Sequence, residues 1–469
     1  MKSHTPMTSG KTLVKPSAMT VSSDEPRLSV PPNPISFAEA VRFWLKLGFV
    51  SFGGPAGQIS IMHQELVERR HWISERRFLH ALNYCMVLPG PEAQQLATYI
   101  GWLMHRTWGG IIAGSLFVLP SLFILIALSW IYLAFGDLPL VAGLLYGIKP
   151  AVTAVVLFAA YRIGSRTLRN PALWTIAAAA FLAVFVFDAP FPLIVLGAAA
   201  IGVAGGRWVP AWFAIDSRHD TDKNYGPAII DDHTPTPCHA RFSWRGALLV
   251  LATGISLWVI AIGALCLLFG WHSVFATMAL FFTKAALLTF GGAYAVLPYV
   301  VQGAVEQHHW LSATQMIDGL ALGETTPGPL IMVVAFVGFV GGWTQAALGA
   351  DSLAAAGVVA AVVVTFFTFL PSFVFILLGG PLVESTHQQP HLTAPLSGIT
   401  AAIVGVILNL AMFFAWHVLL PGGPEGRFEW PLALIGSAAL IALFRFRVGI
   451  IPTIAACGAA GLLVRLLAG

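Results

Sequence analysis

Four ionisable residues stand beside sharp interruptions in otherwise apolar stretches of this chain. Lys46 and Lys284 each lie six residues before the phenylalanine of a Phe-Gly-Gly triplet, Glu92 directly follows a Pro-Gly-Pro triplet, and Glu324 lies three residues before a second one. Within a membrane, an ionisable side chain usually lines a transport pathway or pairs with a partner. A helix that begins after a Gly or Pro break offers unpaired N–H groups that attract anions. The pattern predicts an anion site in which the lysines attract the ligand and the carboxylates carry protons.

The breaks belong to an internal repeat in which Phe52 corresponds to Phe290 and every neighbouring pair keeps the same spacing. Residues 43–91 and 281–329 align without a gap, and 15 of their 49 pairs are identical. After a short insertion in the second copy the similarity continues, so that Pro120-Ser121 corresponds to Pro371-Ser372. The chain therefore contains two copies of one structural unit.

The composition identifies the class of protein. Apolar residues make up 57% and charged residues 10% of the 469 residues, whereas a soluble domain carries about 25% charged residues. Apolar runs longer than about 18 residues recur, and alternation with a period of two residues is absent. We therefore expect an all-α polytopic integral membrane protein in the lipid bilayer.

The chain divides into five parts. Residues 1–35 are polar and are expected to form a disordered cytoplasmic tail. The first transport repeat occupies residues 36–206, and a polar connector, 207–245, is expected in the cytoplasm as well. An extra transmembrane helix, 246–270, precedes the second transport repeat, 274–467.

Arginine counts predict that the two copies have opposite orientations in the membrane. Segment 69–77 holds four arginines and its counterpart 307–315 holds no lysine or arginine, while 162–169 holds three arginines and 418–429 holds one. Because lysine and arginine favour cytoplasmic loops, the repeats are expected in inverted topology, with helix 246–270 supplying the odd crossing. Inverted repeats are the architecture of many secondary transporters.

The interrupted apolar stretches are expected to form re-entrant hairpins. Segment 36–68 would fold at Gly53-Gly54, and segment 78–104 would fold at Pro89-Gly90-Pro91. This folding keeps the two arginine-rich segments of the first copy on one side of the membrane. Such tips are tolerated where they face protein or a water-filled cavity. Full spans with kinks are the alternative.

The predicted anion site combines glycines, prolines and polar residues at the four breaks. Glycine allows close approach of the backbone, and proline begins a helix well. The alternative role of the glycines and prolines is helix packing, and the alternative role of the lysines is contact with the membrane interface. Glu92 and Glu324 are our candidates for proton coupling, and their alternative role is helix capping. The predicted substrate-binding residues are Lys46, Phe52, Gly53, Gly54, Pro55, Gln58, Pro89, Gly90, Pro91, Gln94, Lys284, Phe290, Gly291, Gly292, Thr326, Pro327, Gly328 and Pro329.

No catalytic residue, metal site or cofactor is predicted. The four cysteines are scattered without a CxxC pair, and the histidines of the connector lack the spacing of metal ligands. No P-loop, nucleophile elbow or HExxH motif is present, so the sequence does not indicate an enzyme. The net charge of +4 comes from residues in the loops and does not indicate a nucleic-acid partner.

At the breaks the sequence resembles the chromate ion transporter family, in its long form with two homologous domains. The resemblance rests on Phe52-Gly53-Gly54-Pro55, Phe290-Gly291-Gly292, both Pro-Gly-Pro triplets and the two-copy length. It implies a multi-pass protein of the bacterial inner membrane that exports chromate, driven by the membrane potential or the proton gradient, and confers chromate resistance. It also implies two halves of opposite orientation, in agreement with the arginine counts. Ala293 stands where the first copy has Pro55, so the two breaks are not expected to be equivalent.

Several alternatives stay open at this point. Chromate and sulfate are both tetrahedral dianions, so the same groups would serve a sulfate or other oxyanion carrier or exchanger. An anion channel would need no coupling, and a membrane enzyme would need a nucleophile or redox centre that the sequence does not display. The sequence also leaves open the coupling ion, the direction of transport and whether the protein forms a homodimer.

Overall fold

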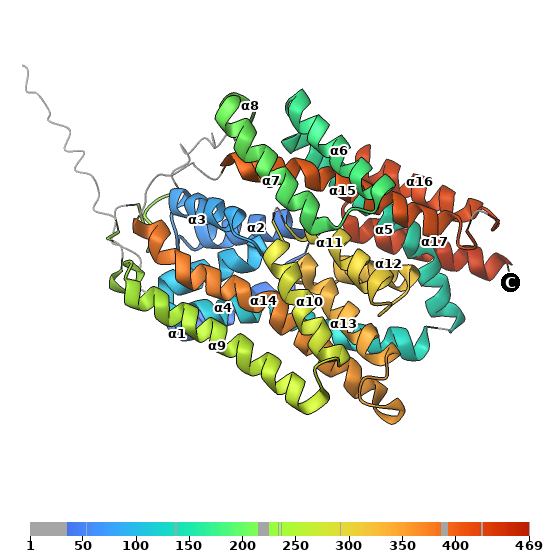
Figure 1. Cartoon of the computed structure of the whole chain (residues 1–469), viewed down its shortest axis with the longest axis horizontal. Coiled ribbons are helices and arrows are strands. Elements are labelled where there is room, and N and C mark those ends of the chain that lie inside the picture. The colour runs from blue at the N-terminus through green and yellow to red at the C-terminus, as the bar shows by residue number, and fades with distance from the viewer. Residues whose placement is uncertain are drawn as a thin grey trace, which may run out of the picture.

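The computed structural model describes residues 35–52, 54–136, 138–213, 225–232, 234–235, 237–290, 292–385, 393–423 and 425–468. The predicted tail, 1–35, lies outside the described residues except for its last residue, and Gly53 and Gly291 lie outside them as well. Helices dominate the described chain (Figure 1). The β pairing found there is an isolated bridge between Ile73 and Ile230.

The first repeat begins with short broken helices and continues with long ones. Within α4 the backbone at His105 and Arg106 leaves helical geometry, with Arg106 at a φ of 58°, and the chain folds back so that Gly101 packs closely against Gly109. The connector then leads into the extra helix. The elements are α1 (Phe37–Val50), α2 (Gly54–His63), the π-helix η1 (Gln64–Arg69), α3 (Glu75–Val87), α4 (Glu92–Phe135), α5 (Pro139–Thr167), α6 (Pro171–Phe187), α7 (Phe191–Trp208), α8 (Pro210–Phe213), η2 (Cys238–Ala240) and α9 (Trp244–Phe269).

The second repeat runs through the same sequence of elements. Its π-helix begins at Gln302, the counterpart of the Gln64 that begins the π-helix of the first repeat, a recurrence that no sequence signal predicted. The elements are α10 (Val274–Leu288), α11 (Ala293–Val301), the π-helix η3 (Gln302–Gln307), α12 (Ala313–Thr325), η4 (Leu330–Met332), α13 (Val333–Thr344), η5 (Ala350–Ser352), α14 (Leu353–Ser385), α15 (Thr393–Leu419), α16 (Trp430–Phe444) and α17 (Ile450–Ala468).

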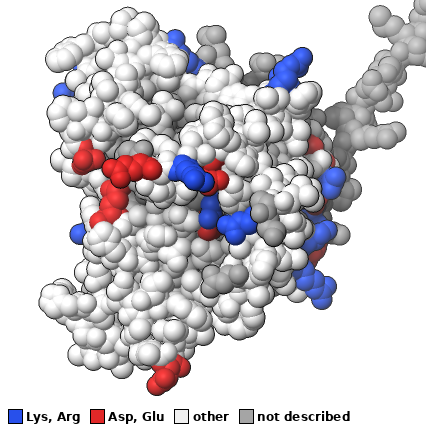
Figure 2. All heavy atoms as spheres, turned by 90° about the vertical axis from the view of Figure 1, so that its right-hand side faces the viewer, with Lys and Arg blue, Asp and Glu red and all other residues white. Residues whose placement is uncertain are grey.

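Seven helices of the described chain are long and apolar enough to cross a membrane, namely α4, α5, α7, α9, α14, α15 and α17. Figure 2 shows a face of the molecule that is mostly uncharged, with the charged side chains gathered in small groups. The protein is therefore a multi-pass membrane protein, and the predicted all-α class is confirmed. The extra helix α9 is the least buried of the seven, at 17% of its apolar window.

Each broken pair of helices in the first repeat folds back on itself. Arg70 Nη1, which follows η1, lies 3.8 Å from Glu39 Oε1 on α1. The rings of Tyr84 on α3 and Tyr99 on α4 lie 6.0 Å apart. In each pair, one residue precedes the break and the other follows it at a similar distance in sequence. Contact between two such residues is the geometry of a hairpin.

The second repeat contains the same two hairpins. Phe281 of α10 stacks on Tyr299 of α11 with ring centroids 4.8 Å apart. A side chain on Gly319 of α12 would collide with Phe336 of α13.

The helices of the hairpins are short, and α1, for example, contains 14 residues. A helix of that length reaches about 21 Å, less than the roughly 30 Å of a hydrocarbon core. The predicted broken, re-entrant form of these helices is confirmed.

The two repeats share one buried core. Val152 and Val156 of α5 belong to the same hydrophobic cluster as Ile403 and Ile407 of α15. In Figure 1, α5 and α15 lie at the α17 end of the molecule, whereas α4 and α14 lie beside the hairpins. The repeats are therefore two interlocked halves of one body.

One arginine-rich segment differs from its prediction. Segment 162–169 is helical as far as Thr167, because α5 continues past its apolar part. Arg162 and Arg166 lie in its last two turns, where cations interact favourably with the free carbonyl groups of a helix end. The segment is therefore a polar helix end rather than a loop.

Candidate anion site at the hairpin tips

The breaks predicted to bind an anion are the tips of the four hairpins. We define tip 1 as the described residues of 51–55, tip 2 as 89–91, tip 3 as the described residues of 289–292 and tip 4 as 327–329, so that Gly53 and Gly291 are left out. Tips 1 and 2 belong to the first repeat, and tips 3 and 4 belong to the second. The contacts between them cross from one repeat to the other.

Two main-chain hydrogen bonds join the tips across the repeats. Gly90 N donates to Thr289 O at 2.7 Å, and Gly328 N donates to Ser51 O at 2.8 Å. In the alignment of the two copies, Gly328 is the counterpart of Gly90, and Thr289 is the counterpart of Ser51. The two bonds are therefore the same contact made in both directions, as an approximate two-fold axis between inverted repeats requires. Gln58 adds a third link, because its Nε2 donates to Gly328 O.

The glycines of tips 2 and 4 press against long helices of the other repeat. Gly90 has a φ of 129° and Gly328 a φ of 106°. A Cβ atom on Gly90 would collide with Ser372 Oγ of α14, and one on Gly328 would lie 2.7 Å from Ser121 Cβ of α4. Positive φ and close contact together explain why glycine stands in the middle of both Pro-Gly-Pro triplets.

The helices that lead away from the tips begin without side-chain caps. The helices that start at the outer ends of the hairpins, α1, α3, α10 and α12, are each capped by a serine hydroxyl. By contrast, α4, α11 and η4 start after Pro91, Gly292 and Pro329, and none of these residues makes a side-chain cap hydrogen bond. Each such start presents N–H groups without intrahelical partners and a partial positive charge. An anion between the tips can accept these hydrogen bonds.

Several buried polar atoms near the tips have no hydrogen-bond partner. Each of these side chains is exposed by 1% or less. A buried polar group without a partner costs about 1–3 kcal/mol, so a concentration of them indicates a polar ligand or water. Serine hydroxyls can donate to an anion, whereas the unpaired amide oxygens can only accept and therefore suit water or another donor. Within the described chain these atoms are Ser51 Oγ, Gln58 Oε1, Gln94 Oε1, Gln95 Oε1 and Ser372 Oγ.

Two carboxylates lie beside tip 3 and its helix. Glu92 Oε1 would lie 3.9 Å from a Cβ atom on Gly292. Glu324 is 4% exposed and accepts a hydrogen bond from the hydroxyl of Tyr294. Among the described residues, neither carboxylate has a cationic nitrogen within 4.0 Å. A membrane carboxylate without a cationic partner is suited to bind and release a proton during transport.

Comparison with known proteins agrees with this architecture. A family model described as chromate transporter matches residues 38–203 and 276–462, one region in each repeat. The chain belongs to the chromate transporter family. It is 32% identical over 443 residues to the "Chromate transport protein" of Pseudomonas aeruginosa, covering 93% of this chain and 94% of that protein.

Two further members of the chromate transporter family are similar over most of the chain. The "Chromate transport protein" of Cupriavidus metallidurans is 28% identical over 409 residues, covering 87% of this chain and 88% of the relative. The "Probable chromate transport protein" of Synechococcus elongatus is 27% identical over 411 residues, covering 87% and 90%. No solved structure matches the chain. The transporter role is therefore shown by the family, while the geometry of the tips comes from the present structure.

The two lysines lie on exposed faces of their helices. Lys46 on α1 and Lys284 on α10 are both exposed. Their neighbours Leu45, Phe49 and Leu287 are exposed as well, which marks the outer faces of these helices. The structure thus places both ammonium groups at equivalent outer positions, and their role in binding the anion stays a prediction.

The structure brings only part of the predicted set into mutual contact. Gln58, Gly90 and Gly328 take part in the contacts described above. Gly292 and Gly54 have positive φ values, 96° and 69°. Gly53 and Gly291 lie outside the described residues. Gln94 Nε2 donates to Thr98 Oγ1 at 3.0 Å, and Thr326 Oγ1 donates to Leu322 O at 2.6 Å, which occupies its proton. Within the tips, Phe52, Pro55, Pro89 and Phe290 are half-buried, and Pro91, Pro327 and Pro329 are buried.

Sequence reasoning missed two ion pairs that join the repeats. Lys149 and Asp318 form one, and Arg77 and Glu384 form the other. Lys149 and Asp318 each stand in a predicted apolar stretch, and that signal could have found them. Their pairing could not be foreseen, because neither charge has a charged counterpart in the other copy.

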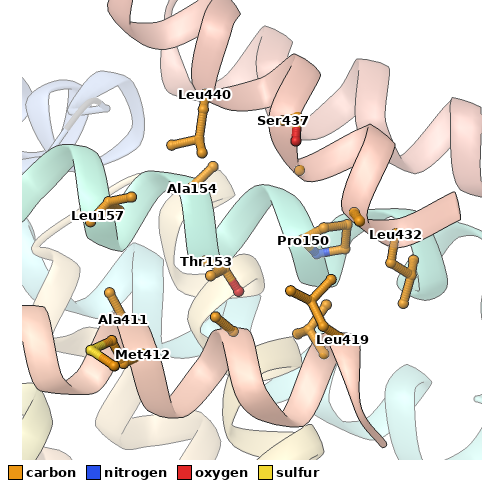
Figure 3. Close-up of a pocket in the computed structure, with 14 residues that line it drawn as sticks. Pro150, Thr153, Ala154, Leu157, Ala411, Met412, Leu419, Leu432, Ser437 and Leu440 are labelled. Carbon is orange, nitrogen blue, oxygen red and sulfur yellow. The ribbon is translucent and has the colours of Figure 1, made fainter. Parts of the chain in front are cut away.

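Outside the tips, the structure offers a pocket of a different character. It has a volume of about 250 Å³ and lies between α5, α15 and α16. Figure 3 shows its apolar lining, with Thr153 and Ser437 as the polar exceptions. Because no charged side chain lines it, the pocket does not suit a dianion. No group of three or more possible metal-ligating side chains occurs in the part of the chain that is described.

Proposed function

We propose that this membrane transporter is a secondary active carrier that exports chromate across the bacterial inner membrane and thereby confers chromate resistance. The observation that carries the proposal is the meeting of the tips, where uncapped helix starts and unpaired buried polar atoms gather. The names of the relatives from P. aeruginosa and C. metallidurans support chromate as the cargo.

The binding chemistry follows from the helix starts. Each start carries roughly half a positive charge, so several of them together offset much of the charge of a dianion. Tetrahedral chromate presents four oxygen atoms, which accept hydrogen bonds from N–H groups and from hydroxyls such as those of Ser51 and Ser372. No cationic side chain is needed between the tips, and the anion is therefore not trapped there by a full ion pair.

The contacts between the tips favour a carrier over an open channel. The hydrogen bonds from Gly90 to Thr289 and from Gly328 to Ser51 close the centre between the repeats. A carrier must close in this way, because its site is open to one side of the membrane at a time. Passage of the anion then requires that the hairpins move relative to the long helices.

Glu92 and Glu324 are the proposed coupling residues. Both lie beside tip 3, so a proton that they bind changes the charge next to the anion. The hydroxyl of Tyr294 holds Glu324 in this position. Proton binding and anion binding would thereby influence each other through electrostatics over a short distance.

Chromate uptake into inverted membrane vesicles tests the function directly. We expect uptake that depends on the membrane potential or the proton gradient, together with chromate tolerance of a sensitive bacterial host. Sulfate added as a competitor separates a chromate carrier from a general oxyanion carrier, because a general carrier would lose chromate uptake in proportion to sulfate. Uptake that follows the anion gradient alone after collapse of both driving forces would instead indicate a channel.

A further inference from the structure

Two buried ion pairs connect the repeats on either side of the tips. In the first junction, Arg77 Nη1 of α3 lies 3.5 Å from Glu384 Oε2 of α14, and Tyr99 OH donates to Glu384 Oε1 at 2.5 Å. The side chains of Arg77 and Glu384 are 13% and 6% exposed. Arg77 and Tyr99 belong to the first repeat and Glu384 to the second. The junction therefore bridges the two moving halves.

The second junction has the same composition with the roles exchanged. Lys149 Nζ of α5 lies 3.9 Å from Asp318 Oδ2 of α12, and Tyr132 OH of α4 donates to Asp318 Oδ2 at 3.0 Å. The side chain of Asp318 is 3% exposed and that of Lys149 is 24% exposed. Here the carboxylate comes from a hairpin helix, whereas in the first junction it comes from a long helix.

The repeat relates the two junctions only in part. The counterpart of Asp318 on α3 is His80, one turn from Arg77, and the counterpart of Tyr132 on α14 is Val383, next to Glu384. Both junctions therefore include the first helix of a second hairpin and the last turns of the other repeat's long helix. The cations differ, because Lys149 lies on α5 and its counterpart in the second repeat is Thr400.

The junctions lie on different sides of the middle of the molecule. In Figure 1, α3 lies toward the left and α12 lies to the right of the centre, with α11, the helix that follows tip 3, between them. The arginine counts predict the α3 end to be cytoplasmic. An anion that travels from one end to the other therefore meets Arg77 on one side of the tips and Lys149 on the other.

Each cation is stabilised by its negative partner. Removing one member of a buried ion pair is unfavourable, because the remaining charge is uncompensated. In the described structure Arg77 Nη1 and Asp318 Oδ1 are buried without a hydrogen-bond partner, so neither junction is saturated. An arriving oxyanion supplies both the negative charge and the acceptors that the cation needs.

We propose that the junctions are two outer oxyanion subsites, and that the transported anion opens each one by replacing its carboxylate beside Arg77 or Lys149. The inference rests on the proposed function, since it concerns the path to the same central site. It makes opening depend on the substrate, because the repeats separate at a junction only when the anion has taken the place of the carboxylate.

The test is sided measurement of chromate KM in right-side-out and inverted vesicles. In Asp318→Asn, no carboxylate competes with chromate for Lys149. We therefore expect the KM for chromate that enters from the α12 end to fall about 10-fold, which corresponds to about 1.4 kcal/mol. KM from the other end should change less than about 2-fold. Glu384→Gln should give the reverse pattern.

Matched variants keep the test decisive. Tyr132→Phe and Tyr99→Phe remove a hydroxyl and keep the ion pair, so KM should stay near that of the parent at both ends. Should Asp318→Asn fail to reach the membrane, Lys149→Gln combined with Asp318→Asn removes both charges, and KM from the α12 end should then rise about 10-fold. An unchanged KM, or an equal shift at both ends, overturns the subsites while transport itself continues. Absence of chromate transport by the parent protein would instead overturn the proposed function.

Discussion

Tip 1 and tip 3 occupy equivalent positions in the two repeats, yet they differ in their chemical surroundings. Tip 3 is flanked by Glu92, Glu324 and Tyr294. At the counterpart positions around tip 1 the chain has Leu330, Met86 and Ala56. The backbone contacts of the two tips are nevertheless the same.

The difference separates two roles that a single site would have to combine. The duplicated backbone supplies helix starts and main-chain hydrogen bonds on both sides of the approximate axis, as a symmetric oxyanion requires. Of the counterpart positions compared above, the ionisable residues are those beside tip 3. We infer that both repeats hold the anion, and that the region around tip 3 alone exchanges protons.

The largest effect is expected from removing the acid beside Tyr294. Glu324→Gln keeps the size of the side chain and its hydrogen bond but cannot bind and release a proton, so chromate uptake should fall about 100-fold. The matched control is Met86→Gln at the counterpart position, which is 48% exposed. Its uptake should stay within about 2-fold of the parent. Initial rates in inverted vesicles give the comparison, and equal losses in both variants would remove the proposed asymmetry.

A smaller effect is expected from crowding the tips themselves. Gly292 and Gly54 have φ values of 96° and 69°, and a β-branched residue is strained there. Gly292→Val also approaches Glu92, so uptake should fall about 30-fold, against about 10-fold for Gly54→Val, which has free space around it. Gly263→Val on α9 is the control, because a Cβ there meets nothing within 4 Å at ordinary helical geometry. Wild-type rates in both tip variants would show that these glycines serve packing alone.

A third substitution makes tip 1 resemble tip 3. Gln58→Val introduces the residue found at the counterpart position, Val296, and removes the hydrogen bond to Gly328 O. The main-chain bond from Gly328 to Ser51 remains, so we expect a loss of about 5-fold in uptake, equivalent to roughly 1 kcal/mol. A loss as large as that of Glu324→Gln would mean that tip 1 carries a role of its own.

The smallest effect is expected from the paired lysines. Lys46→Ala and Lys284→Ala remove ammonium groups that lie on outer helix faces. Because both ammonium groups are exposed, chromate tolerance should change less than about 2-fold in either variant. Complete loss of tolerance with normal amounts of protein in the membrane would confirm the prediction from the sequence that the lysines belong to the binding site.

The helices and their breaks could be predicted from sequence because their causes are local. Pro89-Gly90-Pro91 interrupts a helix through its two prolines, whereas Gly-Gly pairs such as Gly341-Gly342 also occur inside helices. The break at Gly53-Gly54 is recognised because it recurs in the second copy. The hairpins followed from the need to keep two arginine-rich segments on one side. Residues at the end of α5 were misplaced because helical ends extend beyond apolar sequence.

The contacts across the repeats could not be predicted, because they depend on how the two copies dock. Nothing near Gly90 in sequence indicates that its N–H bonds to Thr289 O, and nothing near Lys149 indicates Asp318. The exposed positions of Lys46 and Lys284 have the same origin. A lysine present in both copies indicates that the two positions are equivalent. Whether its side chain faces the protein interior or the outside of the helix bundle depends on how the helices pack.

The reciprocal bonds from Gly90 to Thr289 and from Gly328 to Ser51 have a consequence for kinetics. Because the approximate axis relates the two hydrogen bonds, breaking one of them leaves the repeats connected by the other. The repeats can therefore separate only when both bonds break, so the pair is expected to open cooperatively between two states. The conformational cycle of this protein is therefore expected to switch abruptly between its inward and outward forms, without a long-lived half-released stage.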